Sequence, residues 1–320
     1  MQEAVLGEIE SIDLDLGGIT FMDETDVVVE HHCLDLDLSI GRHHHHQRLR
    51  RRHHAADGVP GVTQDPIEPG AGFTYEFVAP DPGTFFFHPH SGVQLDRALY
   101  APLIIDDPAE PGGYDDEWIV VLDDWTDGVG RSPDEIFEEF AAANGAVSRG
   151  MGHGNMRDMG HGASSPLGDA GDVDYPHYLI NGKPKADPAQ FTGTPGARVR
   201  IRVINAGSDT AFRFAIGGHT LTITHTDGFP VDPVEVDSVL IGMGERYDAI
   251  VTLGDGAFPL VARPFGKTSG GQALAIVRTG SGTAPDAGAN PVELSGQVVI
   301  GSQLQPADAA RLPAKDPDAT

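Results

Sequence analysis

The chain of 320 residues is long enough for about two domains with real hydrophobic cores. Its formal charge of −27, from 21 Lys and Arg against 48 Asp and Glu, excludes nucleic acid as a general partner, because this surface repels a phosphate backbone. The Asp-rich, Lys-poor composition fits both a salt-adapted protein and a GC-rich genome. One cysteine, Cys33, excludes a disulfide framework within the chain and a Cys-cluster metal site, so a metal would need His, carboxylate or Met ligands.

The N-terminal segment, residues 1–10, is acidic, whereas a secretory signal carries positive charge ahead of an apolar stretch. We therefore expect either a cytoplasmic protein or a chain whose true start is missing. The longest apolar runs have five residues, at 118–122 and 273–277, which is far short of the about 18 needed to cross a bilayer. No membrane span is predicted.

Apolar and polar residues alternate between turn signals along much of the chain, which predicts strands. The alternation is clear at residues 73–77, 198–203 and 221–224. Recognised turn sequences separate such segments: Asp-Pro-Gly at 81–83, Pro-Gly-Gly at 111–113, Asn-Gly at 181–182, Thr-Pro-Gly at 194–196 and Asp-Gly at 227–228. With 41 Gly and 24 Pro, the sequence predicts an all-β protein of two β-sandwiches or barrels.

One helix is predicted, near residues 133–142, because Ser132 is a good N-cap, Pro133 suits the first turn and acidic residues follow. The Gly-, Met- and His-rich tract that comes next is typical of a linker. The predicted organisation is a first domain at 1–144, a linker at 145–168, a second domain at 169–280 and a connector tail at 281–320 that leads toward an absent third domain.

The strongest chemical signal is the sequence Gly-Thr-Phe-Phe-Phe-His-Pro-His-Ser-Gly at residues 83–92. On an extended strand, residues i and i+2 point the same way, so His88 and His90 project from one face, about 7 Å apart along the chain. Pro89 confines this strand to a sheet edge or a bulge. Imidazole suits Cu, Zn, Fe and Ni alike. The pattern predicts a pair of metal ligands, with two surface histidines beside an aromatic strand as the alternative.

Further segments accompany this strand in a fixed order. The first predicted domain has Asp-Gly-Val-Pro-Gly-Val-Thr-Gln at 57–64, Phe-Thr-Tyr-Glu-Phe at 73–77 and Gln-Leu-Asp-Arg-Ala-Leu-Tyr-Ala-Pro-Leu at 94–103. The second has Tyr-Leu-Ile-Asn-Gly at 178–182, Val-Arg-Ile-Arg-Val-Ile-Asn at 199–205 and Gly-Glu-Arg-Tyr-Asp at 244–248. This ordered series, over about residues 57 to 280, resembles the multicopper oxidases, the laccase-like and bilirubin-oxidase-like enzymes.

The resemblance implies two cupredoxin-like Greek-key domains and copper as the cofactor. Members of the family reduce dioxygen to water at a cluster of three coppers, which a mononuclear blue copper supplies with electrons from phenols, aromatic amines or metal ions. By this match His88 and His90 are ligands of the coupled copper pair, and Asp57 is similar to the acid that assists proton delivery. The alternative for Asp57 is an ordinary Asp-Gly turn.

The chain departs from the family pattern at residues 31–54, where the His-Trp-His-Gly motif of the family is absent. Eight of the 15 histidines lie in this atypical segment beside five arginines. We interpret it as a shifted reading frame or a rearranged sequence, with a His-rich metal-binding loop as the alternative. The blue-copper Cys motif is absent as well, which also argues against a two-domain copper nitrite reductase.

The segment at 151–161 alternates thioethers and imidazoles, ligands that suit Cu(I). The candidate accessory copper ligands are Met151, His153, Met156, Met159 and His161. We expect weak binding without fixed geometry, because the glycines leave the ligands poorly organised; a plain linker is the alternative. For His177, His219 and His225, in the second predicted domain, we expect hydrogen-bonded structural roles.

The sequence therefore predicts a copper-dependent oxidoreductase that uses dioxygen and a small-molecule or metal-ion donor when complete. This chain alone is not expected to be a working oxidase, so further residues or an oligomer would complete the copper cluster. The alternative is a non-catalytic remnant with a copper-binding or structural role. Members of the family are mostly exported, although this chain shows no signal peptide.

Overall fold

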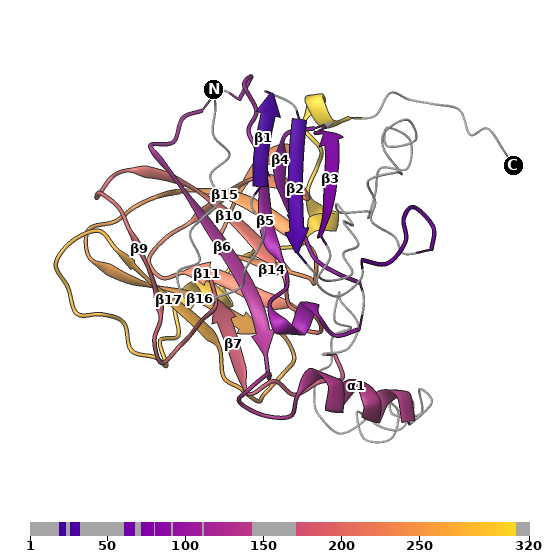
Figure 1. The fold of residues 1–320 in the computed structure, drawn as a ribbon. Coiled ribbons are helices and arrows are strands. Elements are labelled where there is room, and N and C mark those ends of the chain that lie inside the picture. Colours follow the sequence, from indigo (N-terminus) through magenta and orange to yellow (C-terminus); the bar gives the residue numbers. More distant parts are fainter. Residues whose placement is uncertain are drawn as a thin grey trace, which may run out of the picture.

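The computed structural model describes residues 19–23, 26–32, 61–67, 72–79, 81–90, 92–110, 112–142 and 171–311 (Figure 1). Strands dominate these residues, and one α-helix accompanies four short 3-10 helices, η3 (Leu95–Arg97), η4 (Val292–Ser295), η5 (Gly301–Gln303) and η6 (Asp308–Ala310). The predicted all-β fold is confirmed. No helix in the described part of the chain has the length and apolar character of a membrane span.

Two sheets pack face to face and form the larger sandwich. The first has seven strands in the order β13-β12-β15-β10-β6-β7-β8. Its strands are β6 (Asp116–Trp125), β7 (His177–Ile180), β8 (Lys183–Pro184), β10 (Arg198–Asn205), β12 (Leu221–Thr226), β13 (Phe229–Val236) and β15 (Arg246–Thr252). The second sheet has six strands in the order β18-β14-β11-β16-β17-β9. These are β9 (Ala189–Thr192), β11 (Phe212–Ile216), β14 (Ser238–Ile241), β16 (Ala257–Pro264), β17 (Ala273–Arg278) and β18 (Val298–Val299).

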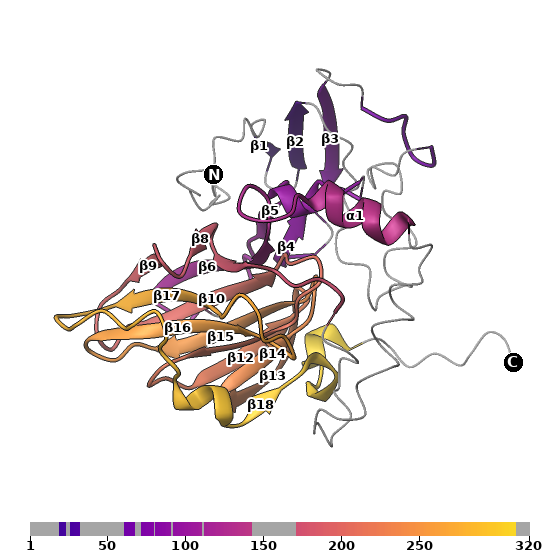
Figure 2. The same ribbon diagram turned by 90° about the horizontal axis from the view of Figure 1, so that it is seen from below.

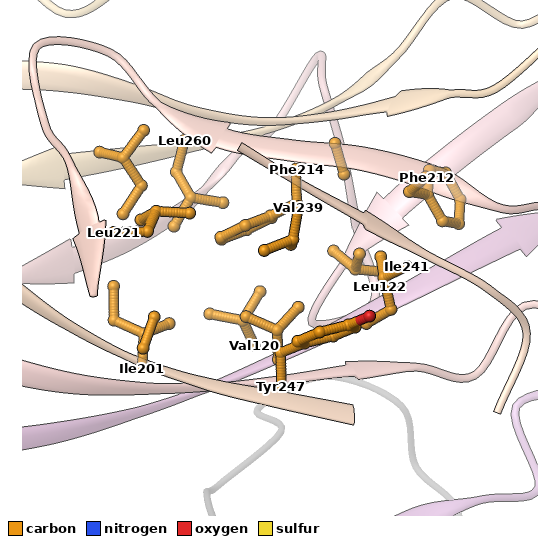
Figure 3. Packing of buried hydrophobic residues seen from close by; sticks show 14 of the residues in the cluster. Val120, Leu122, Ile201, Phe212, Phe214, Leu221, Val239, Ile241, Tyr247 and Leu260 are labelled. Atoms are coloured by element: carbon orange, nitrogen blue, oxygen red, sulfur yellow. The ribbon is translucent and has the colours of Figure 1, made fainter. Parts of the chain in front are cut away.

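The main hydrophobic core fills the space between these two sheets (Figure 3). Alternate residues of β6 and β10, among them Val120, Leu122 and Ile201, point into it from the seven-stranded sheet. Phe212 and Phe214 of β11 meet them from the six-stranded sheet. All five side chains are fully buried, so apolar burial of the kind that the two-residue alternation predicts holds the sandwich together.

The segment before residue 110 forms two smaller sheets. β1 (Ile19–Asp23), β2 (Asp26–His32) and β3 (Gly72–Val78) are antiparallel neighbours in a three-stranded sheet. β4 (Gly83–Phe87) and β5 (Ala101–Ile105) pair as an antiparallel ribbon. Figure 2 shows this ribbon lying between the sandwich and the three-stranded sheet. The ribbon carries the His-Pro-His sequence, so its position on the sandwich decides where the candidate site lies.

Strand β6 comes before the predicted linker but lies inside the seven-stranded sheet. It runs parallel to β10, with Asp116 opposite Val199, and antiparallel to β7, with Trp125 opposite His177. The sandwich of the second predicted domain therefore includes a strand from residues 116–125. The division of the chain into domains stays a prediction, and this pairing bears on where the second domain starts.

The local signals for the helix are confirmed. α1 spans Pro133–Ala142. The Ser132 hydroxyl accepts a hydrogen bond from the backbone N–H of Glu135 at 3.3 Å, and the Glu135 carboxylate accepts one from the N–H of Ser132 at 2.8 Å. These reciprocal bonds form a capping box, and they lower the pKa of Glu135.

Two of the predicted turns are tight hairpins. Asn181 and Gly182 join β7 to β8, and Asp227 and Gly228 join β12 to β13. All four residues have positive φ, with values of 49° at Asn181 and 50° at Asp227. A two-residue hairpin that suits the strand twist requires this conformation, which explains the Asn-Gly and Asp-Gly sequences.

Candidate metal centre

His88 and His90 lie directly after β4, the first half-buried and the second exposed. Their rings stack with centroids 4.7 Å apart and an angle of 27° between the planes. The two imidazoles are therefore on the same side of the chain, as the strand period predicts. Their role as metal ligands stays a prediction.

A backbone carbonyl lies beside one ring nitrogen of His88. Nδ1 of His88 lies 3.2 Å from the carbonyl oxygen of Pro89, which is an acceptor, so Nδ1 carries the proton when this bond forms. Nε2 then keeps its lone pair, and a backbone carbonyl that fixes the tautomer is typical of metal-bound histidines. Two adjacent imidazoles fit copper in ligand type.

The structure tests neither the proposed proton donor nor the accessory copper ligands. Asp57 and the accessory set Met151, His153, Met156, Met159 and His161 lie outside the described residues, as does Cys33. Within the described ranges no group of three or more His, Cys, Asp or Glu side chains could hold a metal ion. The described chain thus offers two imidazoles as candidate ligands.

A buried polar network fixes the start of β4 on the outer face of the seven-stranded sheet. The Thr84 hydroxyl donates to Oδ1 of Asp248 at 2.7 Å and accepts from Nη1 of Arg202 at 2.8 Å. Its backbone carbonyl accepts from Nε of Arg246 at 3.2 Å. Arg200 donates from Nη2 to Oδ2 of Asp248 at 2.6 Å. Because Thr84 is fully buried, these bonds lock the strand that leads to the His pair.

The network pairs its buried charges. Glu110 pairs with Arg200, and Glu117 with Arg202 at 2.7 Å. Burial acts to raise the pKa of Asp248, but Arg200 and Arg202 outweigh it and hold this pKa below its usual range. Asp248 is therefore an ionised carboxylate between two guanidinium groups.

The alternating pattern of β10 does not predict this network, but another feature of the sequence indicates it. Arg200 and Arg202 alternate with apolar residues in β10, which is typical of a strand with one face in water. Both arginines are instead almost fully buried, because β4 covers that face. That feature is charge complementarity. One strand carries two arginines, and the 244–248 segment carries an aspartate that can pair with them.

A second buried polar cluster lies beside the same ribbon. Tyr100 donates its hydroxyl to Oδ2 of Asp123 at 2.7 Å. Asp124 accepts backbone N–H bonds from Ser208 at 2.9 Å and from Asp209 at 3.1 Å. Burial, followed by the neighbouring Asp124 charge, raises the pKa of Asp123 well above its usual value. Burial also raises the pKa of Asp124 to about 6. The carboxyl of Asp123 therefore stays protonated at pH values well above the usual pKa of an aspartate.

Two histidines of the second predicted domain have structural hydrogen bonds, as expected. Nε2 of His219 accepts from the backbone N–H of Gly254 at 3.0 Å, and Nδ1 lies 2.8 Å from the carbonyl of Gly217. Nδ1 of His225 lies 3.0 Å from the hydroxyl of Thr224. His177 begins β7, and the expected role for it stays a prediction.

Family models described as multicopper oxidase match residues 19–110 and 153–282. The multicopper oxidase MmcO of Mycobacterium tuberculosis is 48% identical over 253 residues, which cover 78% of this chain and 49% of that protein. Copper resistance protein A of Pseudomonas syringae pv. tomato is 32% identical over 243 residues, covering 70% of this chain and 39% of that protein. The chain thus spans half or less of the length of these relatives.

Solved structures show the same likeness. The laccase from Botrytis aclada has a TM-score of 0.58 at 27% identity, with 82% of this chain and 48% of that chain covered. The blue copper oxidase from Nitrosomonas europaea has a TM-score of 0.55 at 28% identity, with 80% of this chain and 74% of that chain covered.

Proposed function

Because the chain belongs to the multicopper oxidase family, we propose that it functions in a copper-dependent oxidoreductase and that His88 and His90 are copper ligands. One observation carries the proposal: two stacked imidazoles at the end of a strand that is locked onto the neighbouring sheet. The names of the relatives support it, since one is a multicopper oxidase and another a copper resistance protein.

Copper bound by this pair would supply one-electron redox chemistry toward dioxygen. The residues of this chain would bind and orient the ion. His88 would offer Nε2 while Pro89 holds Nδ1, and the exposed His90 would complete the pair. In this proposal Asp57 supplies protons, and the donor is a phenol, an aromatic amine or a metal ion. Ligands beyond the pair would come from outside the described residues or from a second chain.

We predict that the variant with both His88→Ala and His90→Ala binds less Cu(II) per chain than the wild type. The reason is that two adjacent imidazoles are lost while the sandwich is untouched. The measurement is copper content by atomic absorption after loading to saturation and desalting. His177→Ala is the control, because it removes one imidazole outside the site. Equal copper content in wild type and double variant would contradict the proposal.

The oxidase and its alternative, a non-catalytic remnant, differ in turnover. We propose that the chain loaded with copper is colourless and does not consume oxygen with a phenolic donor. Size-exclusion chromatography with light scattering would show whether a stable oligomer forms. Turnover by an oligomer supports a cluster completed between chains. Copper binding at the pair without turnover in any assembly supports either the remnant or an oxidase completed by further residues.

For the Met- and His-containing segment at 151–161 we predict weak Cu(I) binding. Thioethers are soft ligands that suit Cu(I), but the glycines between them leave the ligands poorly organised. Competition with a Cu(I) chelator would compare the wild type with a variant in which Met151, Met156 and Met159 are replaced by Leu. Equal affinity in both proteins would identify the segment as a plain linker.

A further inference from the structure

Three aromatic rings in alternate positions form a continuous column. The rings of Phe86 and His88 stack with centroids 5.0 Å apart and an interplanar angle of 20°. The rings of His88 and His90 continue the stack at 4.7 Å and 27°. His88 is therefore held between a phenyl ring and a second imidazole.

The inner end of the column is anchored in the molecule. Phe86 is 5% exposed and packs in a cluster with Val121 of β6, Ile204 of β10 and Tyr100. Val121 and Ile204 belong to the outer face of the seven-stranded sheet, opposite the main core. The plane of the Phe86 ring is thus set by close packing, which gives the column a fixed base.

The backbone that carries the column is fixed as well. Thr84, two residues before Phe86, makes the buried hydrogen bonds to Asp248 and Arg202. At the first residue of β4, a Cβ on Gly83 would collide with the carbonyl oxygen of Gly228, so the strand begins in direct contact with the β12–β13 turn. Strand and ring are therefore held independently of each other.

We propose that Phe86 is a positioning residue for the His88 and His90 pair: its ring sets the plane of the His88 imidazole, and through it that of His90. The proposal rests on the proposed copper function of the pair. The imidazole torsion χ2 has a broad energy profile, so backbone position alone does not orient the ring. A ring that packs against the imidazole face, together with the Nδ1 bond to the Pro89 carbonyl, selects one orientation, and a preorganised ligand binds a metal more tightly.

The test compares two consecutive phenylalanines of β4, whose side chains point to opposite faces of the strand. Phe86→Leu and Phe86→Met both remove the stacked ring, and the Met variant keeps most of the volume so that folding is preserved. Phe85→Leu is the control, because Phe85 is also buried on β4 but packs against Arg246 and the turn at Gly228. Circular dichroism and thermal unfolding would verify that each variant is folded.

The first readout uses the metal-free protein. Stacking on a phenyl ring shifts the carbon-bound protons of the His88 imidazole upfield in the NMR spectrum. We expect this shift to disappear in Phe86→Leu and Phe86→Met and to persist in Phe85→Leu. An unchanged His88 resonance in both Phe86 variants would overturn the proposal.

The second readout uses bound Cu(II). Electron paramagnetic resonance spectra are recorded for copper-saturated protein, and the spectrum of the His88→Ala, His90→Ala variant is subtracted to remove signals from other histidines. We expect Phe86→Met to change the copper hyperfine splitting and to weaken binding at the pair by about 10-fold, as loss of supporting contacts around metal ligands does. A wild type that shows neither a difference spectrum nor more bound copper than the double variant would refute the copper function itself. A wild-type signal that Phe86→Met leaves unchanged would refute only the positioning role.

Discussion

Asp248→Asn is expected to destabilise the protein by about 3–5 kcal/mol, the usual cost of breaking a buried ion pair by removing one charge. Asp248 is 1% exposed, and its carboxylate accepts hydrogen bonds from Arg200, Arg202 and Thr84. The Asn variant would leave two buried guanidinium groups with one anionic partner fewer. It would also weaken the attachment of β4 to the sandwich, because the Thr84 hydroxyl of β4 donates a hydrogen bond to this carboxylate.

Acid should reproduce this effect in the wild type. The pKa of Asp248 is lower in the folded protein than in the unfolded chain, so the network contributes stability at pH values above the ordinary aspartate pKa. That contribution is lost as the pH falls through the lowered folded-state pKa. The Asn variant has no such carboxyl, so the stability difference between wild type and variant should shrink below about pH 4.

Urea unfolding followed by circular dichroism, at pH 7 and at pH 3, would measure both effects. Asp187→Asn is the control. It removes an aspartate whose side chain is 78% exposed and paired with Lys183, and such a pair is worth about 0–1 kcal/mol. A loss for Asp248→Asn no larger than that of the control would show that the buried network does not hold the sandwich and the ribbon together.

Asp123→Asn is expected to stabilise the protein at pH 8 and to leave it nearly unchanged at pH 4. The Asp123 carboxyl is buried next to Asp124, and this position disfavours its charged form. An amide has a similar shape and no charge. It can still accept from the backbone N–H of Asp124 and meet the hydroxyl of Tyr100, the two groups that the carboxyl now bonds.

The sign follows from the raised pKa values. A group whose pKa is higher in the folded state stabilises the fold below its unfolded pKa, and that contribution is lost as the pH rises through the folded value. For Asp124 the window runs from about 3.8 to about 6, and for Asp123 the folded pKa is also well above 3.8. The wild type should therefore lose stability across this range, whereas Asp123→Asn should lose less.

Thermal unfolding at pH 4, 6 and 8 tests this pattern. Each kcal/mol gained in the free energy of unfolding corresponds to a rise of about 2–4 °C in the unfolding midpoint of a domain of about 150–250 residues. Glu138→Gln is the control, because Glu138 is exposed on α1 and carries the same change of charge. A Tm gain that is the same at pH 4 and at pH 8 would show that the buried charge of Asp123 is not its cause.

The features of the fold that the sequence predicts are those that local chemistry determines. The helix at 133–142 follows from Ser132 and Pro133, and the hairpins at 181–182 and 227–228 follow from residues that tolerate positive φ. Alternation identifies β10 as a strand. The facing of His88 and His90 also follows from two-residue periodicity.

The remaining features depend on contacts between distant segments. Nothing in the alternation of β10 shows that its polar face is covered, because the cover, β4, lies more than a hundred residues earlier in the chain. The position of β6 in the later sheet depends on its parallel pairing with β10 in the same way. The stack of Phe86 on His88 needs three-dimensional packing as well, although the spacing of the two residues is visible in the sequence.

The placement of β6 has a consequence for biosynthesis. This strand leaves the ribosome well before both of its sheet neighbours. Asp116 pairs with Val199 of β10, and Trp125 pairs with His177 of β7, which are both synthesised later. Until then, the apolar residues that β6 contributes to the core have no partners, and an unpaired apolar strand is prone to aggregate. Long-range parallel pairing is also slow to form. Between the synthesis of residue 125 and that of residue 199, the nascent chain therefore exposes an apolar strand without its full set of partners, and a chaperone bound to β6 in this interval would protect it from aggregation.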